Sequence, residues 1–201
     1  MRFRRAFATS VVALTLMIAS APPAHASPPQ PPSPETTSTF MPMMVLEYDA
    51  EVAAANGYKI VTEPDGTQYS VPVTPAAVAQ QQHFDQLKAS TLSAKAGGDA
   101  WGDCGGSGIS AVKGSLDILR WHTWFTVFGA ATSYSWHVSA IGAVSSNFWD
   151  MGGAGPASGS KSFDGAGKVV GPGYATVPIW SVVTLASGAV CYSLGPTAWF
   201  G

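Results

Sequence analysis

The sequence predicts a mainly β protein in which residues 101–201 form a disulfide-closed antiparallel β-sandwich, of the immunoglobulin-like type or a similar one. Turn signals built from Gly, Pro and Asp separate short apolar runs throughout this block, as in all-β sandwiches and barrels. Residues 134–140 alternate between apolar and polar side chains, which is the period of a half-buried strand. The two cysteines of the chain lie near the two ends of the same block.

The core of this domain is expected in the aromatic run that starts at Trp121 and ends at Ala140. Residues 121–128 are apolar on both faces, as a fully buried strand would be. In the alternating part that follows, Trp136 falls on the apolar face and His137 on the serine-rich face. We therefore expect Trp121 and Trp136 in the core and His137 at the surface.

Turn residues divide the domain into short strands. A turn is expected at Asp164-Gly165, which is one of the Gly, Pro and Asp signals that separate the apolar runs. The expected strands lie near residues 108–113, 118–129, 132–140, 144–149, 159–163, 166–170, 174–184, 188–193 and 196–200.

The first 26 residues have the three-part layout of a secretory signal peptide. Arg4-Arg5 belongs to a positive start, residues 6–19 are apolar, and Ala24-His25-Ala26 fits the cleavage pattern, so we place cleavage after Ala26. The apolar part is shorter than the ~20 residues of a membrane span, so we expect no stable membrane insertion. The protein is predicted to be secreted, and the arginine pair leaves the general secretory and twin-arginine routes both open.

Two further segments precede the sandwich. Residues 27–42 are proline-rich and are predicted to be a semi-rigid linker. Residues 43–100 are predicted to be a small helix–hairpin–helix leader or pro-region, with the turn of the hairpin at Asp65-Gly66. Between residues 27 and 100, acidic residues outnumber basic ones eight to three, which fits a cleaved pro-region and a stalk equally. The expected helices span 45–55 and 74–96, and the expected strands 58–62 and 67–73.

Cys104 and Cys191 are predicted to form a structural disulfide, since an even cysteine count in an exported protein indicates bridges. The alternative is that Cys104 is a catalytic nucleophile. Residues 102–106, Gly-Asp-Cys-Gly-Gly, resemble the nucleophile segment of chymotrypsin-like cysteine proteases. That resemblance implies a base histidine on an upstream barrel, but only His83 precedes Cys104 in the predicted mature chain, so we expect the bridge.

No other pattern predicts catalysis, a cofactor or a metal. His83, His122 and His137 have no partner at metal-ligand spacing, and the aspartates of the sandwich are scattered. Lysine and arginine total only 10 in 201 residues, without the basic stripe of a nucleic-acid binder. The aromatic content instead suggests a binding face for a cell-surface glycan or a protein. The candidate binding residues are Trp149, Trp180 and Tyr174.

Two segments carry a resemblance to known proteins. Residues 58–73, with the Pro64-Asp65-Gly66 turn, and the segment Cys191-Tyr192-Ser193-Leu194-Gly195-Pro196 resemble small, uncharacterised exported proteins of actinobacteria. The Trp-rich short strands are also similar in style to lactococcin-972-like bacteriocins, which are small β-sandwiches shorter than residues 101–201. These resemblances imply an exported β domain and supply no site residue.

Three functions follow from these observations. The first is a secreted, non-enzymatic binding module that presents aromatic side chains on a sheet face. The second is a bacteriocin-like antagonistic protein released from a pro-region by cleavage near residues 96–100. The third is an extracellular hydrolase, which requires a pocket where two carboxylates, or a histidine and a carboxylate, meet.

Overall fold

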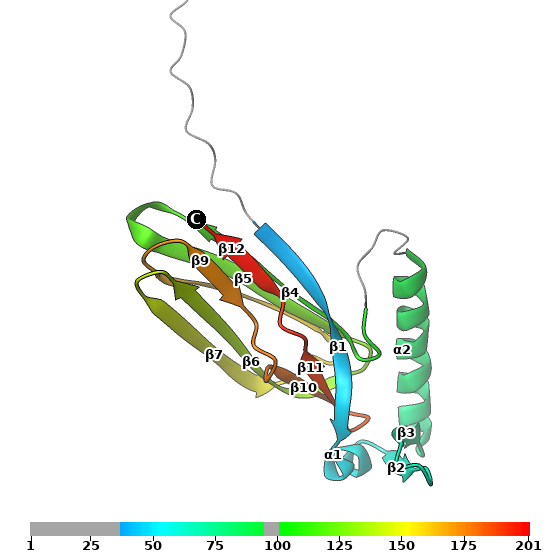
Figure 1. Ribbon diagram of the computed structural model, residues 1–201. Helices are drawn as coiled ribbons and strands as arrows, with labels where there is room; N and C mark the ends of the chain where they lie inside the picture. Colours follow the sequence, from blue (N-terminus) through cyan, green and yellow to red (C-terminus); the bar gives the residue numbers. More distant parts are fainter. Residues whose placement is uncertain (1–36, 95–100) are drawn as a thin grey trace, which may run out of the picture. The chain divides into compact units, whose positions relative to one another are not determined.

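The structure is a computed structural model, which describes residues 37–94 and 101–201. The predicted signal peptide and its cleavage site after Ala26 lie outside the described residues. The described chain is mainly β, as predicted, and most of it belongs to one antiparallel sheet of ten strands (Figure 1). Its strands are β1 (Thr37–Tyr48), β4 (Gly105–Lys113), β5 (Ile118–Val127), β6 (Ala131–Gly142), β7 (Ser146–Ala154), β8 (Ser160–Lys168), β9 (Gly173–Thr176), β10 (Val182–Leu185), β11 (Ala189–Ser193) and β12 (Thr197–Phe200).

Strand β1 connects the two halves of this sheet. The strand order is β12-β9-β6-β10-β11-β1-β4-β5-β8, with β7 paired to β6. The first half of β1, Thr37 to Met43, pairs with β4, and the second half, Met43 to Tyr48, pairs with β11 across an irregularity after Val45. One strand therefore passes from one half of the sheet to the other, as strands do where sheets bend at a bulge.

The position of β1 corrects two expectations. Residues 37–42, expected in the proline-rich linker, form the first half of a central strand, and the sheet does not begin at residue 101. Pro42 is compatible with the strand although it has no N–H. The long-range partners of β1 are more than 60 residues away, so local composition does not reveal them. Met43 is 0% exposed and belongs to the core.

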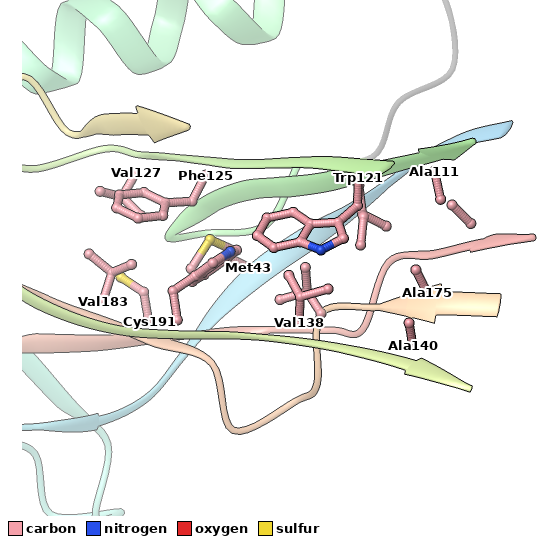
Figure 2. Close-up of a cluster of buried hydrophobic side chains, with 14 of the residues drawn as sticks. Met43, Ala111, Trp121, Phe125, Val127, Val138, Ala140, Ala175, Val183 and Cys191 are labelled. Carbon is pink, nitrogen blue, oxygen red and sulfur yellow. The ribbon is translucent and has the colours of Figure 1, made fainter. Parts of the chain in front are cut away.

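The core lies between the two halves of the sheet. Trp121 and Trp136 are 4% and 0% exposed, which confirms their predicted burial. The Trp136 indole Nε1–H donates to Thr123 Oγ1 at 3.2 Å, so its buried polar group is satisfied. Figure 2 shows side chains from β4 and β5 facing side chains from β6, β9 and β10, among them Ala111, Phe125, Val127, Val138, Ala140, Ala175 and Val183.

Two expected strand divisions are wrong. The expected strands at 159–163 and 166–170 are one strand, β8, and Asp164-Gly165 lies inside it rather than in a turn. Position 165 favours glycine because the side chain of its cross-strand neighbour, Trp121, lies over it. A Cβ at residue 165 would be 2.1 Å from the indole ring. The expected strand 174–184 is divided instead into β9 and β10, since Pro178 cannot donate to a sheet ladder.

This close approach predicts the effect of a methyl group. Gly165→Ala should lower the free energy of unfolding by roughly 1–3 kcal/mol, because the new Cβ must displace the packed Trp121 ring. Urea denaturation followed by tryptophan fluorescence measures this effect. Gly152→Ala is the matched control, since a Cβ there would meet only the Tyr134 carbonyl oxygen at 3.6 Å. Equal stability of the two variants would show that the ring moves freely.

Four elements follow β1: α1 (Ala50–Ala55), β2 (Tyr58–Thr62), β3 (Gln68–Pro72) and α2 (Pro75–Ala94). The first helix starts later than the expected residue 45 because the chain is still in β1 there, and the Asp49 carboxylate caps it by accepting from the N–H groups of Glu51 and Val52, each at 3.0 Å. Phe84 of α2 is 5% exposed in a small cluster with Tyr58 and Ala186. That this segment is a separable leader or pro-region stays a prediction.

The predicted disulfide is confirmed: Cys104 and Cys191 are bonded, with their Cα atoms 5.8 Å apart. The bridge does not link neighbouring strands of the sheet. β1 lies between the strands that carry or follow the cysteines, with Val45 opposite Cys191 and the Cys104 N–H donating to the Met43 carbonyl at 3.2 Å. The bridge therefore spans the position where β1 passes from β4 to β11.

Candidate functional site

One outer face of the sheet carries the most distinctive surface chemistry. It is formed by β7, β6, β9 and β12, which are neighbours in the sheet. Ala140, Ala175 and Ala198 in the last three of these strands are 0% exposed and point into the core. Because side chains alternate along a strand, the residues on either side of these alanines point outward.

Ile141, Tyr174 and Trp199 form a row across this face. Ile141 pairs with Tyr174 between β6 and β9, and Tyr174 pairs with Trp199 between β9 and β12. The Tyr174 and Trp199 ring centroids are 5.4 Å apart, and the Trp199 side chain is 63% exposed. We call these three residues the aromatic row.

A row of hydroxyl groups lies beside the aromatic row. Ser139, Thr176 and Thr197 occupy the next outward positions on the same three strands, again in register. The Thr197 hydroxyl donates to Thr176 Oγ1 at 3.0 Å, and the Thr176 hydroxyl donates to the Pro196 carbonyl at 3.1 Å. None of the six side chains in the two rows is an Asp, Glu, Lys or Arg.

The three predicted binding residues have different environments. Tyr174 belongs to the aromatic row, and Trp180 is 57% exposed in the segment between β9 and β10, next to Ile179 at 63%. Trp149, the third predicted binding residue, is half-buried, with its ring centroid 5.2 Å from that of Trp121. The exposed aromatic of β7 is its neighbour Phe148, at 46%, because the alternation runs the other way. Trp199 and Phe148 were not among the predicted residues.

A chain of hydrogen bonds lies farther along β6 on the same face. His137 and Asp150 are cross-strand partners between β6 and β7, and the Asp150 carboxylate contacts His137 Nδ1. On the other side of the ring, His137 Nε2 is 3.0 Å from the Ser135 hydroxyl. A carboxylate only accepts, so Nδ1–H donates to Asp150, and in the tautomer that carries its proton on Nδ1 alone, Nε2 accepts from the Ser135 hydroxyl. The fold thus brings together residues that appeared scattered in the sequence.

A second histidine–aspartate pair lies on the other half of the sheet. His122 of β5 and Asp164 of β8 are cross-strand partners, with Nδ1 and the carboxylate 2.8 Å apart. Both side chains are accessible, and the imidazole stacks on Trp124 at 5.5 Å between centroids. A small cavity of about 150 Å³ adjoins the pair, lined by Ser110, Ala111, Val112, Arg120, Trp121, His122 and Asp164.

The other residues considered for chemistry lie as follows within the described chain. Cys104 is bonded to Cys191 and 2% exposed, so it is not a thiolate nucleophile. His83 is exposed on α2. Among residues 37–94 and 101–201, no three His, Cys, Asp or Glu side chains are grouped so that they could hold a metal ion. No helix in these ranges is long and apolar enough to cross a membrane.

Comparisons of this chain with protein-family models, with curated proteins and with solved structures returned no match.

Proposed function

We propose that the protein is a secreted binding module that recognises a cell-surface glycan through the outer face of β6, β9 and β12. The aromatic row carries this proposal, because Tyr174 and Trp199 present neighbouring rings on adjacent strands. Export is supported by the predicted signal peptide and by the disulfide, since disulfides persist in oxidising compartments outside the cytosol.

The chemistry of the two rows fits a neutral sugar chain. An aromatic ring gives the C–H face of a pyranose a large apolar contact, and rings held by rigid strands lose little conformational freedom on binding. The hydroxyl groups of Ser139, Thr176 and Thr197 both donate and accept, as sugar hydroxyls do. The absence of charged residues from both rows disfavours acidic or basic ligands and supports a neutral glycan over a charged protein surface.

We also infer that the sheet is a β-sandwich. The switch of β1 between β4 and β11, and a core enclosed by opposite halves of the sheet, support two packed layers. In this arrangement the glycan-binding face is the solvent side of one layer, where a long polymer can lie across the strands without entering a pocket.

Removal of the exposed indole tests the binding proposal. Trp199→Ala should weaken glycan binding at least about tenfold, equivalent to about 1.4 kcal/mol, because exposed Trp side chains at binding centres dominate affinity. Depletion of the protein from solution by insoluble cell walls, chitin and cellulose identifies a ligand, and calorimetry with its soluble oligosaccharides gives the affinity.

The matched control is Tyr69→Ala, which removes a 40% exposed aromatic from the separate β2–β3 hairpin and should leave binding unchanged. Equal affinity of Trp199→Ala and the unmodified protein would contradict the proposed face. Capture of a protein in place of any polysaccharide would replace the glycan with a protein partner.

The antagonistic-peptide alternative is less well supported. A fragment released by cleavage near residues 96–100 would lack β1, which lies between β4 and β11. The hydrolase alternative gains support from a specific observation, the contact of His137 with both Ser135 and Asp150.

A further inference from the structure

Ser135, His137 and Asp150 are arranged in the order of a serine-hydrolase triad. In such triads the acid contacts one imidazole nitrogen and the nucleophilic hydroxyl contacts the other, so that the ring can take the hydroxyl proton and remain oriented. Asp150 contacts Nδ1 and Ser135 contacts Nε2 at 3.0 Å, which is within hydrogen-bond reach of a general base. The structure makes this arrangement from two adjacent strands.

Local structure holds the imidazole in place. Ser135 and His137 are two residues apart on β6 and therefore share its outer face, while the pairing of β6 with β7 puts Asp150 directly opposite His137. The ring of Phe148 stacks on the imidazole with 5.7 Å between centroids. The His137 backbone N–H donates to the hydroxyl oxygen of buried Ser181 at 3.1 Å. The His137 side chain is only 16% exposed, so contacts surround most of it.

The Ser135 hydroxyl is open to a substrate. Ser135 is exposed, and its cross-strand neighbour on β7 is Gly152, which has no side chain. Even a Cβ at residue 152 would come no closer than 3.6 Å to other atoms. The Asp150 side chain is 65% exposed. A site this open fits an acyl group at the surface of a polymer better than a bond that must enter a closed cavity.

The triad and the aromatic row lie on one strand face. Ser135, His137, Ser139 and Ile141 alternate outward along β6. At the spacing of a strand, Ser135 and Ile141 are separated by about 20 Å, which a short oligosaccharide spans. A glycan held at Tyr174 and Trp199 can therefore extend along β6 to the serine.

We propose that Ser135 is a nucleophile that removes O-acyl groups, such as acetyl esters, from the bound glycan, with His137 as general base and Asp150 as the group that orients it. The choice of an acylated glycan as substrate rests on the proposed binding function. The acyl-transfer chemistry rests on the triad geometry alone.

The reaction is balanced without any cofactor. Ser135 Oγ attacks the ester carbonyl carbon while its proton passes to His137 Nε2, and Asp150 stabilises the resulting imidazolium. The bond between the carbonyl carbon and the glycan oxygen breaks, and that oxygen takes the proton from His137. Water then attacks the acyl-serine as His137 accepts a proton from it, which releases the carboxylic acid and restores Ser135.

A fluorophosphonate probe tests the nucleophile directly. The secreted protein should gain the mass of one phosphonyl group at Ser135, measured by intact mass spectrometry and peptide mapping. Ser135→Ala should abolish the labelling, and His137→Gln should slow it at least about 100-fold, the usual contribution of a general base. Two matched controls should label like the unmodified protein: Ser133→Ala, an exposed serine on the same strand, and His122→Gln, which changes the other aspartate-paired histidine.

Acetate release from O-acetylated polysaccharides separates the two proposals. Trp199→Ala should keep its probe labelling and lose acetate release, because its serine is intact and its glycan contact is removed. If Trp199→Ala releases acetate normally while Ser135→Ala does not, the nucleophile stands and the aromatic row is not the glycan site. An unlabelled wild-type protein, or labelling that persists in Ser135→Ala, would overturn the assignment of Ser135.

Discussion

A fragment that begins at Trp101 is expected not to fold. It lacks β1, whose first half pairs with seven residues of β4 and whose second half pairs with β11. Without this strand the sheet order is interrupted between β11 and β4, and the core loses Met43, which is fully buried. Both strands would expose unpaired N–H and C=O groups along the gap. Far-ultraviolet circular dichroism and a urea titration should show no cooperative unfolding transition.

The control for this truncation is the chain that starts at the predicted mature residue, Ser27, which retains β1 and should unfold cooperatively. A second variant has a specific protease site placed within residues 95–100 and is cut after folding. The cut protein should elute as one species in size-exclusion chromatography, because β1 is paired on both sides. A cooperative transition in the fragment that begins at Trp101 would contradict the role given to β1 and would return support to release from a pro-region.

This dependence on β1 shows where local sequence patterns stop being informative. The alternation of residues 134–140, the burial of Trp121 and Trp136, and the cysteine bridge follow from periodicity, side-chain size and cysteine count, and the structure confirms each of them. The membership of residues 37–42 in the sheet depends on partners at Gly106 to Ala111, far away in the sequence. The prolines that flank residues 37–42 indicated a linker, whereas pairing with β4 makes these residues part of a strand.

The candidate site has the same two levels of predictability. The outward direction of Trp199 can be inferred from the small alternating segment 197–200, whose Ala198 and Phe200 are buried. The position of Trp199 beside Tyr174 cannot be inferred from the sequence, because it depends on the register between β9 and β12. The contact of His137 with Asp150 likewise requires the register of the β6–β7 hairpin, although the His137 and Ser135 spacing on one face was visible in the sequence.

Loss of the disulfide is the second change with a large expected effect. The bridge links residues 87 positions apart, and the chain-entropy model gives roughly 4–5 kcal/mol for a loop of this length. A domain of this size is stabilised by only about 5–15 kcal/mol in total. The double variant Cys104→Ala, Cys191→Ala should therefore lose a large part of its free energy of unfolding, measured by urea denaturation at equilibrium.

The position of the bridge adds a reason specific to this fold. It ties the residue that precedes β4 to β11, the two strands between which β1 is inserted. Without the bridge, β4 and β11 are not tied to each other in the unfolded chain. The conformational entropy of the unfolded state is then higher, and the two strands must come together before β1 can pair with both of them. The unmodified protein, unfolded in the presence of a reductant, is the matched comparison and should lose stability to a similar extent. A double variant within about 1 kcal/mol of the oxidised protein would show that pairing of β1 alone holds the two halves of the sheet together.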